Sequence, residues 1–75
     1  MNKDILLIAA NAMKVSPEEA EKHYKAVDQI NGFYFWNPVR GGIAVLVNLN
    51  GEKLAATSSV RYETHLQAFL DGRRN

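Results

Sequence analysis

The sequence predicts an α+β fold in which a three-stranded antiparallel β-meander packs against helices, in the order α-α-β-β-β-α. One observation is the Asn50-Gly51 dipeptide between two apolar runs, a strong hairpin signal because both central residues of a type I′ turn need positive φ. A second is the aromatic run 33–36, which precedes that hairpin. The third is helical periodicity in the segments on either side of these strands.

Length and composition limit the class of protein. A chain of 75 residues is expected to form one compact domain, residues 1–75. A domain of this size buries only about 60% of its unfolded surface, so oligomerisation would help its stability. The sequence has no cysteine, so neither a disulfide nor a cysteine-ligated zinc can supplement the core. The net charge of +1 gives no electrostatic argument for nucleic acid or an anionic membrane.

An apolar segment near the N-terminus predicts the first helix. Asn2 or Asp4 is expected to cap it, and its apolar stripe continues to about Lys14. The same segment imitates a secretory signal, but its apolar run is short and Asp4 lies where such signals carry positive charge. No run reaches membrane-spanning length, and we expect a cytoplasmic protein.

A second helix is predicted to follow directly. Ser16 is its expected N-cap, Pro17 fits the first helical position, and Glu19 completes a capping box. Its apolar periodicity continues to about Ile30. Gly32 is expected to end this helix in the left-handed conformation.

Strands are predicted at residues 33–36, 43–49 and 52–57. Pro38 removes a backbone donor, so the first strand is expected to lie at a sheet edge or to end there. A two-residue turn would place Val47 opposite Leu54. This register defines one core face, against which the helices are expected to pack: Ile43, Val45, Val47, Leu49, Leu54 and Ala56.

The last helix is predicted over Val60–Asp71. Ser58 or Ser59 is expected to cap it, since neither serine lies in a nucleophile-elbow motif. Gly72 is expected to end the helix, and residues 73–75 to fray.

The aromatic run is the most informative feature for function. Alternation along a strand places Phe33 and Phe35 on one face and Tyr34 and Trp36 on the other. If helices cover only one face, the second pair forms an exposed apolar patch, which is typical of an interface. The alternative is that the first or last helix crosses to this face and makes it core.

The leading hypothesis is a non-enzymatic protein–protein interaction module, a homodimer or a subunit of a larger assembly. Its predicted interface comprises Tyr34, Trp36, Leu46, Ala44, Arg40, Gly41 and Gly42.

A second hypothesis is a nucleic-acid or anion-binding module. Aromatic rings beside arginines stack on the bases of single strands, and Trp36 shortly precedes the Arg40 turn. Arg61, Arg73 and Arg74 would add positive charge. The simpler interpretation of the turn is that its glycines satisfy a tight reversal and its arginine is solvated.

A third hypothesis is a minimal enzyme that uses His23 or His65 with Glu63. Neither histidine has a second metal ligand at helical spacing, and no phosphate-binding glycine loop is present. His23 falls on an apolar stripe, where a histidine bonded to the backbone is the simpler interpretation. We therefore expect no catalytic residue, no cofactor and no metal.

Overall fold

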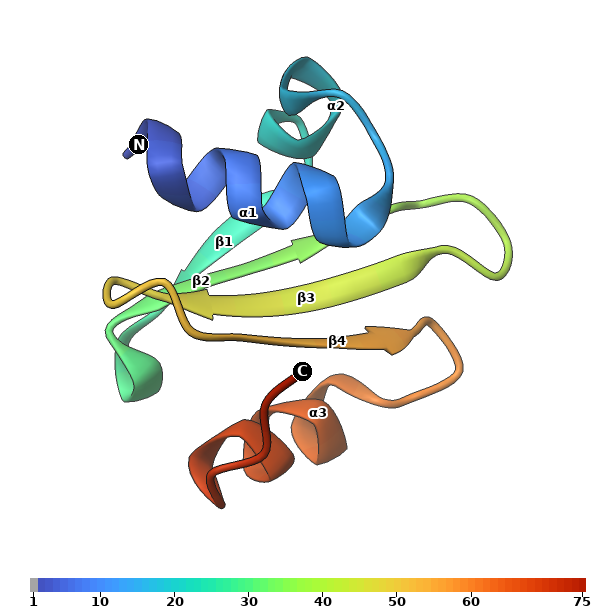
Figure 1. Cartoon of the computed structure of the whole chain (residues 1–75). Helices are drawn as coiled ribbons and strands as arrows, with labels where there is room; N and C mark the ends of the chain where they lie inside the picture. Colours follow the sequence, from blue (N-terminus) through green and yellow to red (C-terminus); the bar gives the residue numbers. More distant parts are fainter. Residues whose placement is uncertain (1) are drawn as a thin grey trace.

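The computed structural model describes residues 2–75 and shows an α+β fold with a four-stranded antiparallel sheet, strand order β1-β2-β3-β4 (Figure 1). The class is the predicted one, but the sheet has one strand more than expected. No helix in residues 2–75 is both long and apolar enough to span a membrane. The elements are α1 (Lys3–Met13), α2 (Pro17–Glu21), β1 (Tyr24–Val27), the 3-10 helix η1 (Asp28–Ile30), β2 (Gly32–Trp36), β3 (Ile43–Asn48), β4 (Lys53–Thr57) and α3 (Tyr62–Leu70).

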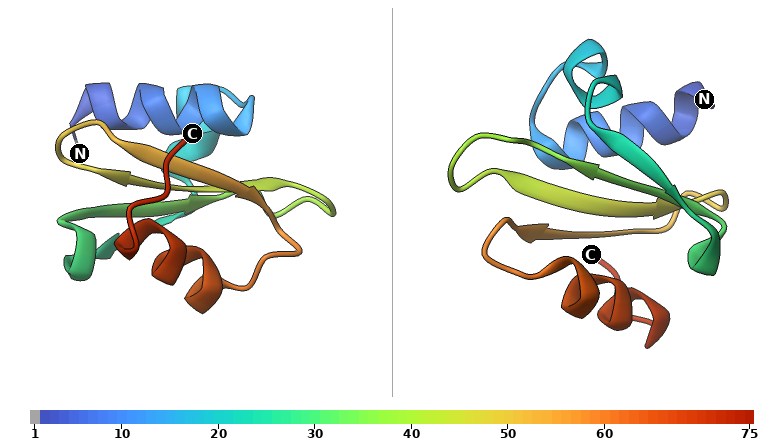
Figure 2. Two further views of the ribbon diagram at one scale, coloured as in Figure 1. Left: turned by 60° about the horizontal axis from the view of Figure 1, so that its bottom comes forward. Right: turned by 180° about the vertical axis from the view of Figure 1, so that it is seen from behind.

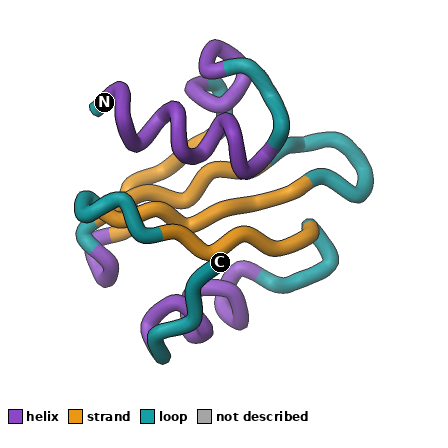
Figure 3. Tube along the Cα trace, viewed as in Figure 1, coloured by secondary structure: helices purple, strands orange, loops and turns teal. Residues whose placement is uncertain are grey.

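Helices lie on both faces of the sheet, so the molecule has three layers (Figures 2 and 3). α1 and α2 cover one face, and α3 covers the other. The cause is β3, a central strand whose side chains are apolar on both faces. Val45 packs with α1, Leu46 packs with α3, and neither has any exposed surface. A strand that is apolar on both faces needs cover on both, so the expectation of helices on one face is wrong.

Two hydrophobic clusters correspond to the two faces. The cluster under α1 is the larger and includes Phe35, which is fully buried. The cluster under α3 is smaller and comprises Val27, Ile30, Leu46 and Phe69.

The starts of both N-terminal helices are confirmed. The side chain of Asn2 accepts a hydrogen bond from the N–H of Asp4 at 2.8 Å. Ser16 Oγ accepts from the N–H of Glu19 at 3.1 Å, and Pro17 occupies the first helical position. These caps depend only on residues within one turn, which is why the sequence identifies them.

The predicted second helix does not continue to Ile30. α2 ends at Glu21, and residues 24–27 form the edge strand β1, which pairs with β2 from Tyr24 opposite Phe35 to Val27 opposite Gly32. Pairing with a distant aromatic strand outweighs the local helical preference of this segment.

The turn between β3 and β4 has three residues rather than two. Asn48 Oδ1 accepts hydrogen bonds from the backbone N–H groups of Asn50 (3.1 Å) and Glu52 (2.9 Å). Gly51 has φ +85°, whereas Asn50 does not have positive φ, so the turn is not type I′. This geometry is the common three-residue hairpin loop with a left-handed glycine at its end.

The additional loop residue shifts the strand register by one. Leu54 lies opposite Leu46, not opposite Val47, and Lys53 takes the place opposite Val47. The faces of β4 are therefore exchanged relative to the prediction: Leu54 and Ala56 lie on the α3 side of the sheet.

α3 begins at Tyr62 rather than Val60. Its N-cap residue is Arg61, which makes no side-chain capping bond. Neither serine caps the helix, and Ser59 Oγ instead lies 2.7 Å from Thr57 Oγ1. Gly72, with φ +98°, ends the helix as predicted.

Candidate functional site

The predicted interface separates into a buried part and a surface part. Leu46 has no exposed surface and Ala44 is 4% exposed, since α3 covers this face of the sheet. The expectation that these two residues form an exposed patch is wrong. Tyr34 and Trp36 lie on the same face and are only partly buried.

Four aromatic rings from three segments form a continuous chain of contacts around this pair. The rings of Tyr34 and Trp36 are stacked, with centroids 5.8 Å apart and planes at 26°. His23, just before β1, lies 6.0 Å from Trp36, and Tyr62 of α3 lies 4.8 Å from Tyr34. Lys25 Nζ lies 3.9 Å from the centroid of the Tyr62 ring, a cation–π contact. We call these five residues the aromatic surface.

Strand pairing explains how the aromatic surface is assembled. Tyr34 and Trp36 point the same way because they are two residues apart on β2. The N–H of Trp36 donates to the carbonyl of His23 at 3.1 Å, and Lys25 lies opposite Tyr34. The predicted helix over residues 24–27 would not bring His23 and Lys25 to this pair, and Tyr62 reaches it because α3 covers this face of the sheet. The available signal was the Asn31-Gly32 dipeptide, whose glycine begins β2.

The ionisation of Tyr34 is affected by its position. Burial raises the pKa of Tyr34 above its ordinary value of 10.0, and the neighbouring Tyr62 adds to this rise. At neutral pH the Tyr34 hydroxyl is therefore uncharged.

The Arg40-Gly41-Gly42 turn of the predicted interface belongs to the loop that leaves the end of β2 directly after Trp36 (Figure 1). Arg40 and Gly41 are exposed. Gly42 is buried, and its N–H donates to the carbonyl of Val39 at 2.9 Å. The loop thus presents Arg40 at the same end of β2 as Trp36.

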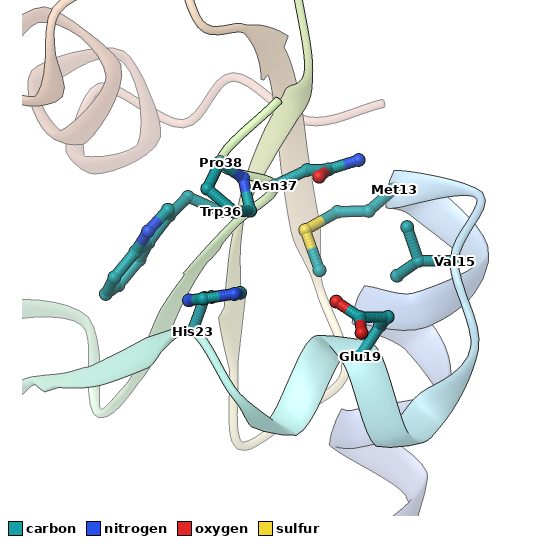
Figure 4. A pocket seen from close by; sticks show the side chains of 7 residues that line it. All are labelled: Met13, Val15, Glu19, His23, Trp36, Asn37 and Pro38. Carbon is teal, nitrogen blue, oxygen red and sulfur yellow. The ribbon is translucent and has the colours of Figure 1, made fainter. Parts of the chain in front are cut away.

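A crevice borders the aromatic surface where the end of β2 meets α1 and α2 (Figure 4). The crevice is too narrow to hold a water molecule, so it is a packing feature rather than a ligand site. Its lining residues are Met13, Val15, Glu19, His23, Trp36, Asn37 and Pro38.

The groups of the enzyme hypothesis do not converge. His65 is 1% exposed, with Nε2 2.7 Å from the carbonyl oxygen of Leu54, whereas Glu63 is exposed on α3. His23 lies in the aromatic surface. Within residues 2–75, no three His, Asp or Glu side chains are grouped so that they could hold a metal ion.

Three further arginines of the nucleic-acid hypothesis, Arg61, Arg73 and Arg74, are divided between the two ends of α3. Arg61 directly precedes Tyr62 and is exposed. Arg73 and Arg74 follow the other end, and the guanidinium of Arg74 lies 3.7 Å from the ring centroid of Phe69. Arg61 is therefore the arginine of this set that adjoins the aromatic surface in sequence.

Comparison with protein-family models, with curated proteins and with solved structures gave no match. The aromatic surface offers ring faces, a phenol and a cation. These groups are typical of surfaces that recognise other molecules.

Proposed function

We propose that this protein is a non-enzymatic protein–protein interaction module, a homodimer or a subunit of a larger assembly, and that the aromatic surface is its contact site. The observation that carries the proposal is the partly exposed stack of Tyr34 and Trp36, extended by the rings of His23 and Tyr62. Tyrosine and tryptophan anchors carry much of the energy of interfaces. We expect the module to act in the cytoplasm.

Binding would bury the exposed parts of Tyr34 and Trp36 against an apolar surface of the partner. Each ring already rests on its neighbour, so little side-chain freedom is lost on association. Lys25 and the Arg40 loop would form the polar rim that surrounds an apolar interface centre. In this proposal Leu46 supports the rings from within the core and does not touch the partner.

The first test is the solution mass of the wild type and of Trp36→Ala by light scattering across a concentration range. For a homodimer we expect a mass near twice 8.4 kDa for the wild type. Trp36→Ala should weaken association by at least about tenfold, since anchor residues typically contribute 2 kcal/mol or more. Leu49→Ala is the control, because Leu49 is a large exposed side chain (62% exposed) in the distant hairpin loop.

A second variant separates loss of contact from loss of folding. Lys25→Glu changes an exposed residue and introduces a negative charge beside the Tyr62 ring. The proposal that the aromatic surface is the contact site would be contradicted if Trp36→Ala and Lys25→Glu both fold and both dimerise as the wild type does. If the wild type is a monomer throughout, the homodimer is excluded. If another partner then binds the wild type and both variants equally, the aromatic surface is excluded as the contact site.

A second candidate function is binding of single-stranded nucleic acid, which the position of Lys25 over the Tyr62 ring favours. Bases can stack on exposed rings while lysine or arginine contacts the phosphates. Trp36 is the only tryptophan, so its fluorescence reports binding directly. We expect an oligonucleotide to quench it at low salt and to be released steeply as salt rises. The absence of quenching at low salt, or salt-independent binding, would exclude this function.

A further inference from the structure

A cavity of about 270 Å³ lies between β4 and α3. It shares no lining residue with the aromatic surface, although the ring of its lining residue His65 lies 5.9 Å from the ring of Tyr34. α3 lies beside β4 in Figure 1, and small side chains on both elements leave space between them: Ala56 on β4 and Ala68 on α3. Most of the lining is apolar. The lining residues are Leu54, Ala55, Ala56, Val60, Thr64, His65, Ala68 and Arg73.

The C-terminal segment connects the two walls of this cavity. It leaves α3 and returns to β4, as Figure 2 shows. The side-chain amide of Asn75 bonds both backbone groups of Ala55: Oδ1 accepts from the N–H at 2.9 Å and Nδ2 donates to the carbonyl at 3.0 Å. The N–H of Asn75 also donates to the carbonyl of Lys53 at 3.1 Å. The expectation that residues 73–75 fray is therefore wrong, and the cavity has a defined border.

His65 contributes a buried polar atom without a partner. The Leu54 carbonyl oxygen can only accept, so His65 Nε2 at 2.7 Å must carry a proton. In the neutral ring, Nδ1 is then an acceptor. Nδ1 is buried and has no hydrogen-bond partner among residues 2–75. Because Nδ1 has almost no accessible surface, His65 borders the cavity through its other atoms and does not offer Nδ1 to a ligand.

Arg73 places a cation at the cavity. Its backbone is held by a hydrogen bond from its N–H to the carbonyl of Ala68 at 3.0 Å. The side chain is exposed and forms no salt bridge within the described chain, residues 2–75. The adjacent carboxylate of Asp71 accepts a hydrogen bond from Gln67 at 3.0 Å. An available guanidinium beside an apolar cavity favours a ligand with an apolar body and an anionic end.

We infer that this cavity binds a small apolar carboxylic acid, with the apolar body between β4 and α3 and the carboxylate on the Arg73 guanidinium. The volume of about 270 Å³ is below the roughly 300–1,000 Å³ typical of drug-sized ligands, so the ligand is of the size of a substituted phenyl acid or a short fatty acid. This site does not depend on the proposed interaction function, since the two share no residue.

Phenylacetate is a suitable probe, and its neutral analogue phenylacetamide is a matched comparison. In ¹H–¹⁵N NMR titrations of the full chain we expect phenylacetate to shift the amides of Leu54, Ala56 and Ala68 and the ring signals of His65. Phenylacetamide should bind at least about tenfold more weakly, because it cannot form the charged bond to Arg73. Arg73→Gln should make the two affinities equal, whereas Arg61→Gln, an arginine at the other end of α3, should change neither.

Filling the cavity provides an independent test. Ala68→Leu should abolish binding of both probes while the rest of the spectrum keeps the wild-type fold, and Thr64→Leu serves if that variant does not fold. Equal binding of acid and amide to the wild type, or no shift at the cavity residues, would overturn the inference. So would an Ala68→Leu variant that changes the mass of the protein in solution, because a second chain would then occupy this space. Trp36→Ala should leave phenylacetate binding unchanged, which separates this site from the proposed interface.

Discussion

At the scale of single residues, Gly32 shows how one dipeptide takes two roles. The chain contains Asn-Gly twice, at residues 31–32 and 50–51. In the second, the glycine has the positive φ that a turn requires. In the first, Asn31 takes the left-handed conformation (φ +50°), and Gly32 begins β2 against the neighbouring strand. A Cβ atom at Gly32 would lie 2.1 Å from the carbonyl oxygen of Val47, so close approach of two strands requires this glycine.

Gly32→Ala should lower the free energy of unfolding by about 2–3 kcal/mol, since β2 and β3 must move apart to admit the methyl group. Urea denaturation measures this change. Gly72→Ala is the matched control, because nothing lies within 4 Å of its added Cβ and only the positive φ is unfavourable. We expect a cost of about 1 kcal/mol there. Equal losses in the two variants would contradict the crowding at Gly32.

Tyr34 should make stability dependent on alkaline pH. Burial raises its pKa, so the folded state keeps the phenol proton where the unfolded state releases it. The stability linked to this proton is fully present below the unfolded pKa of 10.0 and is lost as the pH rises through the higher folded pKa. Urea unfolding between about pH 8 and pH 11 should show a shallower decline for Tyr34→Phe than for the wild type. If the free energy of unfolding declines equally with pH in Tyr34→Phe and in the wild type, the Tyr34 proton does not contribute to stability.

At the scale of elements, β1 is the segment on which local and tertiary preferences conflict. The bond from the N–H of Trp36 to the carbonyl of His23 sets the alternation of the antiparallel ladder. In that alternation, Lys25 and Val27 form hydrogen-bonded pairs with β2, and the backbone groups of Tyr24 and Ala26 point away from it.

Amide exchange followed by NMR should therefore distinguish the strand from the predicted helix. The amides of Lys25 and Val27 should exchange slowly, and those of Tyr24 and Ala26 quickly, because no strand pairs with the outer edge of β1 in residues 2–75. A helix over 17–30 would instead protect consecutive amides. Uniform protection of residues 24–27 would contradict the four-stranded sheet.

At the scale of the whole molecule, cover on both faces of the sheet decides which apolar residues are available to a partner. Leu46 is fully buried and Leu49 is 62% exposed, although both belong to the same apolar run. Leu46→Asp should unfold the protein, since burial of a carboxylate costs several kcal/mol and a domain of this size has little stability in excess. Leu49→Asp is the control and should remain folded.

Circular dichroism and NMR dispersion measure both outcomes. A folded Leu46→Asp variant would mean that α3 does not cover this face, and the predicted interface of Leu46 and Ala44 would regain its basis.

The sequence by itself determined the features that depend on neighbours within a few residues. These are the caps of α1 and α2, the existence of β2, β3 and β4, and the end of α3 at Gly72. Tyr34 and Trp36 could also be assigned to one face, since alternation along a strand is local.

Only the tertiary structure decided the features that depend on contacts between distant segments. β1 exists because β2 offers it a partner, and the register of β4 follows from the side chain of Asn48 in the turn. The second layer of helix forms because β3 is apolar on both faces, which removes Leu46 from the surface. His23, Lys25 and Tyr62 join Tyr34 and Trp36 only after these segments have packed. Strand pairing and burial depend on contacts between segments distant in sequence, so periodicity along the chain does not predict them.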